Sequence, residues 1–211
     1  MNRHRAGKPA SRPLGEVRVI GGSLKRSKLP VPDRPGLRPT PDRVRETLFN
    51  WLAPRIAGAR VLDLCAGTGV LAIEALSRGA AQAWINEPDA QLADLIATAL
   101  ARLKIADRAR LTRQDARRLL AHLPPQGIDI AFIDPPYTGE LWVELLAALP
   151  RTLAADARVY VEHPAEIAAP WDPAHWHAPR AGRAGRVRYA LLEQAAGSAS
   201  LAAVTAEEPA P

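Results

Sequence analysis

A carboxylate, two prolines and an aromatic residue, Asp134-Pro135-Pro136-Tyr137, directly follow the apolar run 128–133, which is typical of a buried strand. Proline fixes its own φ and pushes the residue before it into extended geometry, so the Asp134 carboxylate and the Pro135 carbonyl are both held in place. Two fixed acceptors beside an aromatic ring suit an exocyclic amino group on a flat, stacked base. We therefore take the tetrapeptide as the candidate catalytic site, although a Pro-Pro turn that only ends a strand has the same sequence.

A second chemical signal is a glycine turn between an apolar strand and an apolar helix. Glycines there let the backbone approach a ligand closely, and the helix start offers free N–H groups. Glu87 ends the next predicted strand, where an acid commonly accepts both hydroxyls of a ribose. We expect a nucleoside-like cofactor at this turn, which comprises Asp63, Cys65, Ala66, Gly67, Thr68 and Gly69.

Two cofactors are compatible with the turn. Residues 67–72 satisfy the dinucleotide fingerprint G-x-G-x-x-G/A, which would indicate a nicotinamide enzyme. Asp63 counts against that interpretation, because its carboxylate would repel a pyrophosphate but could order the amino-acid part of S-adenosylmethionine through water. A hydride-transfer enzyme also has no evident use for the segment 134–137. Asp115, followed by Ala116 after the third predicted strand, could accept from an adenine amino group or equally cap a helix.

Together these residues resemble class I S-adenosylmethionine-dependent amino-methyltransferases. The upstream segments 18–25 and 37–52 narrow the resemblance to the RsmD type, and it runs from about Val17 to Gln194. It implies methylation of the N2 amino group of one guanine in small-subunit (16S) ribosomal RNA, presented within an assembled or assembling ribosomal subunit. Cys65 departs from the family pattern, which often has an aromatic residue there. The motif alone also allows an adenine-N6 methyltransferase on DNA or RNA, and a non-catalytic RNA-binding assembly factor remains the alternative from another class.

Composition is consistent with an intracellular enzyme. The 211 residues are enough for one domain with a small appendage. A single cysteine excludes an internal disulfide, and no Cys/His cluster indicates a metal. We see neither a membrane-spanning apolar segment nor a secretory signal at the N-terminus, and we expect a cytoplasmic monomer.

The N-terminal quarter of the chain is strongly basic. Residues 1–50 contain 12 Arg and Lys against 4 Asp and Glu, whereas the rest of the chain is close to neutral. This asymmetry indicates that an N-terminal appendage contacts the phosphates of RNA, although a solvated surface has the same composition. The candidate RNA-binding residues are Arg18, Lys25, Arg26, Lys28, Arg38, Arg43 and Arg45.

The pattern of strands and helices predicts an α/β, Rossmann-like fold with a seven-stranded, mostly parallel sheet. We expect strands at 60–65, 82–87, 109–114, 128–133, 157–162, 174–178 and 186–193, and helices at 89–104 and 140–149. The last two strands form an antiparallel hairpin around the loop 180–185, which is rich in arginine and could touch RNA.

Four regions follow from this pattern: a disordered basic arm at 1–15, an RNA-binding appendage at 16–56, a methyltransferase domain at 57–194 and a disordered tail at 195–211. Within the appendage we expect a β-hairpin of 16–20 with 23–29, turning at Gly21-Gly22. Thr40 is expected to be the N-cap of a helix that has Pro41 in its first position and extends to about residue 56. Arg38, Arg43 and Arg45 would stay exposed near its start.

Overall fold

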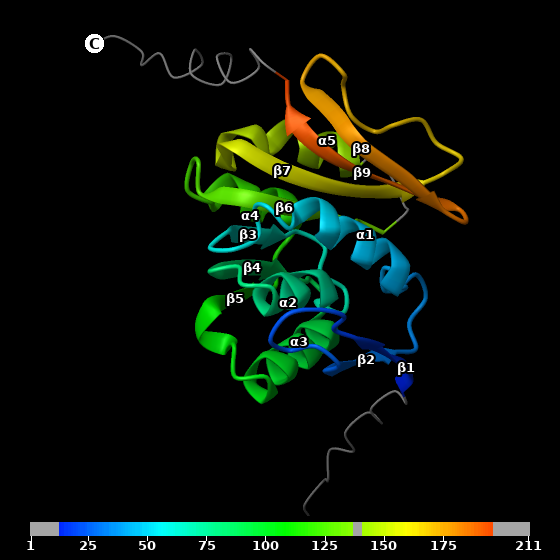
Figure 1. Ribbon diagram of the computed structural model, residues 1–211, viewed down its shortest axis with the longest axis vertical. Coiled ribbons are helices and arrows are strands. Elements are labelled where there is room, and N and C mark those ends of the chain that lie inside the picture. The colour runs from blue at the N-terminus through cyan, green and yellow to red at the C-terminus, as the bar shows by residue number, and fades with distance from the viewer. Residues whose placement is uncertain (1–12, 137–140, 196–211) are drawn as a thin grey trace, which may run out of the picture.

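The computed structural model describes residues 13–136 and 141–195, and it is built around a seven-stranded sheet (Figure 1). The strand order is β5-β4-β3-β6-β7-β9-β8, with the first five strands parallel and β9 antiparallel to both neighbours. The predicted mostly parallel sheet with a C-terminal hairpin is therefore confirmed. The strands are β1 (Pro13–Arg18), β2 (Lys28–Pro32), β3 (Arg60–Asp63), β4 (Gln82–Asn86), β5 (Ala109–Thr112), β6 (Ile128–Ile133), β7 (Leu153–Pro164), β8 (Trp176–Ala184) and β9 (Val187–Gln194).

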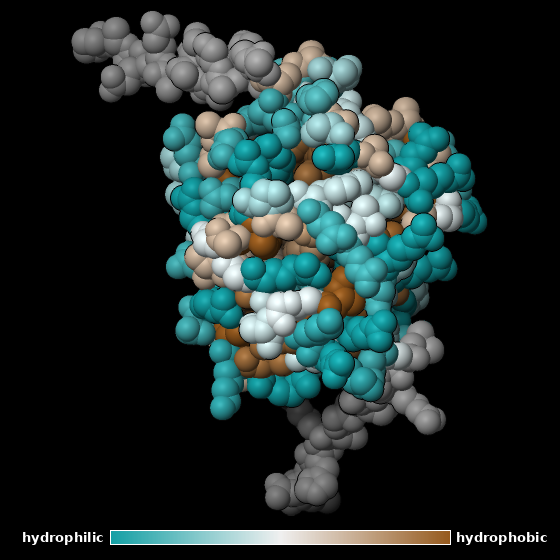
Figure 2. Space-filling view, in the orientation of Figure 1, coloured by the Kyte–Doolittle hydropathy of each residue, from teal (hydrophilic) through white to brown (hydrophobic). Residues whose placement is uncertain are grey.

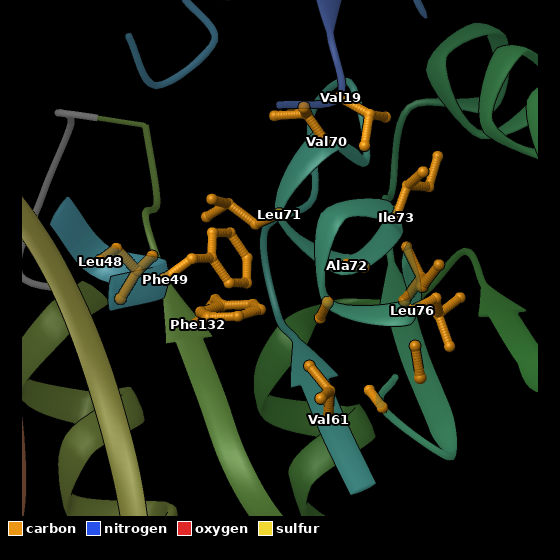
Figure 3. Packing of buried hydrophobic residues seen from close by; sticks show 14 of the residues in the cluster. Val19, Leu48, Phe49, Val61, Val70, Leu71, Ala72, Ile73, Leu76 and Phe132 are labelled. Carbon is orange, nitrogen blue, oxygen red and sulfur yellow. The ribbon is translucent and has the colours of Figure 1, made fainter. Parts of the chain in front are cut away.

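Helices cover both faces of the sheet and enclose two apolar clusters. The N-terminal hairpin, α1, α2 and α3 contribute to one cluster, and α4 and α5 contribute to the other. Figure 3 shows Phe49 of α1 beside Phe132 of β6, and Val19 above Val70 at the start of α2. The appendage therefore shares its core with the sheet. The helices are α1 (Asp42–Leu52), α2 (Val70–Ser77), α3 (Ala90–Arg102), α4 (Ala116–His122) and α5 (Leu141–Ala148), with short 3-10 turns at Ala106–Arg108 and Pro150–Thr152.

The predicted tight turn at Gly21-Gly22 is wrong. β1 pairs with β2, so the connection spans residues 19–27, and β1 begins at Pro13, within the segment that we expected to be disordered. The loop is instead shaped by α2: a Cβ on Gly22, which has φ +74°, would lie 2.0 Å from the Ser77 carbonyl oxygen. The contact with Ser77, which is 55 residues away in sequence, thus shapes the loop in place of a tight turn. It does so because it provides hydrogen-bond partners for backbone groups of the loop.

Helix α1 starts one residue later than predicted and ends earlier. Its N-cap residue is Pro41, with no side-chain cap, and the helix ends at Leu52 rather than near residue 56. Thr40, the predicted N-cap, is buried, and its carbonyl oxygen accepts a hydrogen bond from Arg45 Nε at 3.0 Å. Its hydroxyl donates to Glu162 in β7, so a tertiary contact takes the group that would have capped the helix.

The predicted loop 180–185 is mostly strand. β8 continues to Ala184 and β9 begins at Val187, so the chain reverses through Gly185, at φ +60°, and Arg186. Gly182 permits this extended pairing, because a Cβ there would come within 2.5 Å of the Tyr189 ring directly opposite. In the described part of the chain, no helix combines the length and apolarity needed to cross a membrane.

Candidate active site

Five acidic side chains follow one another along the carboxyl edge of the sheet. Adjacent strands are about 4.8 Å apart, so the row spans roughly 20 Å. The strand order changes direction between β3 and β6: β4 and β5 lie on one side of β3, and β6 and β7 on the other. Ligands in open α/β sheets bind at the carboxyl ends of the strands beside such a topological switch point. In the order β5, β4, β3, β6 and β7, the acids are Asp115, Glu87, Asp63, Asp134 and Glu162.

Asp134 and Pro135 lie at the end of β6, immediately beside the switch. Asp134 is half-buried, Pro135 is buried and Pro136 is exposed, whereas Tyr137 lies outside the described residues. β6 is apolar except for Asp129 and lies between β3 and β7, which fixes the position of the Asp134 carboxylate at the edge of the sheet. The two acceptors predicted from the sequence are therefore on a rigid strand end.

The surroundings of Asp134 disfavour its charged form. Burial raises its pKa well above the usual range, and the neighbouring carboxylates of Glu162 and Asp63 raise it further. Asp134 and Glu162 occupy matching positions on neighbouring strands, because Ile133 of β6 pairs with Val161 of β7. A hydrogen-bond donor on a ligand would stabilise the charged form of Asp134, which the protein itself disfavours.

Glu162 is an active-site neighbour to which the sequence analysis assigned no role. It is buried, and the Tyr160 hydroxyl donates to its Oε1 at 2.6 Å while the Thr40 hydroxyl donates to the same carboxylate. Trp142 Nε1 donates to its backbone carbonyl at 2.6 Å. The signal that could have found it is an acid at the end of the strand predicted at 157–162. His163, the next residue, is buried and lies edge-on to Trp171.

The glycine turn and Glu87 form one hydrogen-bonded unit. Gly67 and Gly69 have φ +55° and +74°, and Gly69 is the N-cap residue of α2. Gly67 N–H donates to Glu87 Oε2 at 2.8 Å, and Asp89 N–H donates to its Oε1 at 2.9 Å. Burial raises the pKa of Glu87, and these two N–H groups lower it again. Leu37 of the appendage covers the turn, since a Cβ on Gly67 would lie 3.1 Å from its Cδ1.

Asp63 lies under the glycine turn with its carboxyl group buried. Burial raises its pKa to about 7, although backbone N–H groups of Ala72 and Cys65 donate to it. The pKa of the Cys65 thiol is also raised by burial and by Asp63, so the thiol stays protonated and is a poor nucleophile. Ala66 is half-buried and Thr68 is buried in the same turn.

Asp115 caps helix α4. Its side chain accepts from the backbone N–H groups of Arg117 and Arg118 at 3.0 and 3.4 Å, and Ala116 is the first residue of the helix. The capping alternative raised from the sequence is therefore realised. Asp115 is nevertheless exposed, and its Oδ2 takes no part in the cap and contacts only Arg117 Nη1, at 3.4 Å, within the described residues, so it can still accept from a ligand.

Asn86 joins the ends of three strands, which the sequence did not indicate. Its Nδ2 donates to the carbonyls of Leu64 and Gln114, and its Oδ1 accepts from Thr112 Oγ1 at 2.9 Å and from Gln114 N–H at 3.1 Å. Asn86 is fully buried, so all four bonds are needed to satisfy its amide. It fixes the Gly67 and Asp115 turns relative to each other.

S-adenosylmethionine fits the residues at this edge. Two glycines at positive φ allow close approach of a ligand, Glu87 offers a carboxylate for a diol, and Asp115 offers one for an amino group. Asp63, the last residue of β3, lies beneath the glycine turn and adds negative charge, which suits an ammonium group better than a pyrophosphate. Among the described residues, no group of His, Cys, Asp and Glu side chains is arranged to hold a metal ion.

The predicted RNA-binding residues are divided between exposed and buried positions. Lys25, Arg26, Arg38 and Arg43 are exposed. Arg18 pairs with Asp42 at 2.8 Å and Lys28 with Glu16 at 2.7 Å, and both cations remain about two-thirds exposed at 67% and 65%.

Arg45 is a correction to the sequence analysis. Its side chain is completely buried, and it pairs with Asp42 at 2.5 Å and with Glu74 at 3.4 Å. It cannot contact RNA, because none of its side chain is exposed to solvent. The apolar face of α1 suggested that Arg45 would point outward, but Glu74 on α2 supplies a buried partner that the sequence of α1 does not reveal.

The comparisons with known proteins agree with this geometry. The family model of conserved hypothetical protein 95 matches residues 17–193. Ribosomal RNA small subunit methyltransferase D of Escherichia coli (strain K12) is 45% identical over 191 residues, which are 90% of this chain and 96% of that protein. The putative rRNA methyltransferase YlbH of Bacillus subtilis (strain 168) is 35% identical over 73% of this chain and 86% of its own length.

A solved structure shares the same fold. The putative methyltransferase yhhF from Escherichia coli superposes with a TM-score of 0.77 at 42% identity, over 85% of this chain and 98% of that chain. Family match, close relatives and fold thus all cover the glycine turn and the Asp134 strand end. The chain belongs to the conserved hypothetical protein 95 family, the RsmD-type S-adenosylmethionine-dependent methyltransferases that its sequence resembles.

Proposed function

We propose that this protein transfers a methyl group from S-adenosylmethionine to the exocyclic N2 of a guanine in small-subunit ribosomal RNA. The observation that carries the proposal is the position of Asp134 and Pro135 at the end of β6, one strand from the glycine turn that ends β3. The names of the relatives support ribosomal RNA as the substrate. The choice of guanine N2 rests on the resemblance to the RsmD type.

The cofactor is held by the turn after β3 and by the ends of β4 and β5. The sulfonium of S-adenosylmethionine makes its methyl group electrophilic. The Gly67–Gly69 backbone lies where the methionine portion would bind, and Glu87 is placed to accept from the ribose hydroxyls. Because Glu87 now accepts from Gly67 N–H, binding of a diol requires it to share or exchange that bond. Asp115 is the acceptor for the adenine amino group.

The target nitrogen needs help from the protein because its lone pair is delocalised into the ring. The Asp134 carboxylate and the Pro135 carbonyl accept its two hydrogens and thereby orient the lone pair, while Tyr137 stacks on the base. Alignment of the reactants can contribute about 7–11 kcal/mol to the rate enhancement. The raised pKa of Asp134 also makes it a competent acceptor for the proton that is lost after transfer.

The appendage supplies contacts to the RNA backbone. Arg18, Lys25, Arg26, Lys28, Arg38 and Arg43 are exposed on or near the β1–β2 hairpin and the start of α1. Phosphate contacts of this kind position a nucleic acid without reading its sequence. The target base must leave its stack at a cost of a few kcal/mol, which is smallest in an RNA loop.

The proposal is tested with methyl-labelled S-adenosylmethionine and small ribosomal subunits from a strain that lacks this gene. The RNA is digested after reaction and the labelled nucleoside is identified by mass spectrometry. N2-methylguanosine at one site is the expected product. N6-methyladenosine would instead assign the adenine chemistry, and cofactor binding without any label on RNA would assign a non-catalytic assembly factor.

An Asp134→Ala variant ties the activity to the site. It should lose methylation while its affinity for S-adenosylmethionine stays unchanged. Turnover equal to that of the unaltered protein would remove Asp134 from the mechanism.

A further inference from the structure

The tip of the β8–β9 hairpin carries a concentration of positive charge that the proposed function has not used. Residues 178–188 contain four arginines and no acidic residue. All four arginine side chains are exposed, and they lie on both strands and in the turn: Arg180, Arg183, Arg186 and Arg188.

Strand register places this tip at the catalytic edge. Pro164, the last residue of β7, pairs with Val187, and His163 pairs with Arg188. The turn therefore lies beside the carboxyl end of β7, the strand next to β6 and Asp134. Figure 1 shows the turn on the same side of the molecule as α1 and the β1–β2 hairpin, and hydrophilic residues cover this end in Figure 2.

The charge at the tip is poorly compensated within the protein. Arg183 and Arg188 are directly opposite across the β8–β9 ladder, an arrangement of like charges that destabilises a sheet. Arg183 Nε donates to the Gly185 carbonyl, and Arg186 pairs with Glu166 while remaining 89% exposed. In the described ranges, Arg180 and Arg188 have no hydrogen-bond or ion-pair partner.

The hairpin is also fixed firmly to the rest of the active-site edge. The Tyr189 ring, seated over Gly182, lies 5.7 Å from the Trp51 ring of α1 and 6.3 Å from the Tyr160 ring of β7. Tyr160 in turn donates to Glu162 beside Asp134. The arginines are thus held at a defined position relative to the catalytic strand end. Binding of a ligand to them therefore costs little conformational entropy for ordering the hairpin.

We propose that the tip of the β8–β9 hairpin is a second RNA-contact surface, which binds backbone phosphates beside the target nucleotide across the active site from the N-terminal appendage. The proposal rests on the proposed function, since it takes the same RNA as substrate. Guanidinium groups bind phosphate oxygens in a bidentate manner, and RNA supplies phosphates at the spacing of a polymer. Its anions would relieve the repulsion between Arg183 and Arg188.

The test compares an Arg183→Gln/Arg188→Gln variant with the unaltered full-length protein on small ribosomal subunits that lack the modification. We expect KM for subunits to rise about tenfold at 0.15 M salt, with kcat and the Kd for S-adenosylmethionine unchanged. The slope of log Kd for subunits against log salt should fall by about 2, one for each lost phosphate contact. The melting temperature should not fall, because the change removes a like-charge pair.

Two control variants separate this role from others. Arg183→Lys/Arg188→Lys keeps the charges and should restore most of the salt dependence. Lys104→Gln/Arg110→Gln removes two exposed cations near the amino ends of the strands, and it should leave KM and the salt slope unchanged.

Equal KM and equal salt slopes for the Gln variant and the unaltered protein would overturn the proposal for the hairpin while leaving the methyltransferase assignment intact. A rise in KM with an unchanged salt slope would overturn it too, since it would indicate a contact other than phosphate. Absence of RNA methylation by the unaltered protein would instead contradict the proposed function, and direct binding of subunits would then still decide the role of the arginines.

Discussion

Two carboxyl groups in this protein have opposite surroundings. Glu74, in the middle of α2, is fully buried and accepts from the N–H groups of Ile20 and Gly21 at 2.7 and 2.8 Å. Arg78 donates to it at 2.8 Å, and Arg45 at 3.4 Å. Asp134, at the end of β6, has two other carboxyl groups as its charged neighbours, those of Glu162 and Asp63.

The difference separates a structural acid from a chemical one. The charge of Glu74 is compensated by cations and backbone donors, so it attaches the appendage to the helix that follows the glycine turn. Among the residues that the structure describes, no cation or hydrogen-bond donor compensates the charge at Asp134, which leaves the carboxylate available to a donor on the substrate. Substitutions at the two sites should therefore change different properties.

The largest effect is expected for Asp134→Asn. Methylation should fall by about 10²–10⁴-fold, because an amide cannot take the proton and offers one acceptor oxygen instead of two. The free energy of unfolding of this variant should not fall with its activity. The raised pKa means that Asp134 favours folding below its unfolded pKa, and this contribution is lost as pH rises through the folded pKa.

Removal of the charge should consequently leave the free energy of unfolding at pH 8 unchanged or increased. Urea unfolding of the variant and the unaltered protein at pH 8 and pH 4 measures this. A clear loss of stability at pH 8 would show that Asp134 is compensated as Glu74 is.

Arg45→Met should instead destabilise the protein by about 3–5 kcal/mol, because it leaves the buried Glu74 with less compensation. Urea unfolding gives the value. A matched control is Arg113→Gln, which breaks only an exposed pair with Asp94 and should change stability by less than about 1 kcal/mol. Similar effects for the two substitutions would argue against a structural role for the Glu74 site.

Glu162→Gln should move the pH dependence of catalysis. The negative charge of Glu162 raises the pKa of Asp134, together with burial and Asp63, so its removal lowers that pKa. The acidic limb of kcat/KM should therefore shift to lower pH. The Gln side chain can still accept from Tyr160, which keeps the packing. Superimposable pH profiles would show that the two carboxyl groups act independently.

The smallest effect is expected at Asp115, which joins a structural and a binding role. Asp115→Ala should cost about 1 kcal/mol of stability, because helix α4 loses its cap. Asp115→Ser keeps a capping oxygen and should restore stability, while its Kd for S-adenosylmethionine rises several-fold. Isothermal titration calorimetry gives the Kd, and an unchanged value in the Ser variant would assign Asp115 to capping alone.

Local backbone chemistry determined the part of the site that could be predicted from the sequence. A strand followed by glycines and a helix, and an apolar strand followed by Asp134-Pro135-Pro136, depend on φ preferences and on burial within about ten neighbouring residues. The parallel sheet followed from the alternation of such units. These features placed Gly67, Glu87 and Asp134 correctly at the ends of β3, β4 and β6.

Only the tertiary structure decided how buried polar groups are paired. Arg45 and Glu74 are 29 residues apart, and Glu162 neighbours Asp134 only because β6 and β7 are adjacent in register. The loop at Gly21 and the strand through Gly182 likewise follow contacts with Glu74 and Tyr189 rather than local turn rules. Such pairs depend on which elements meet in space, and a polar group loses more free energy when buried without a partner than any local preference can return.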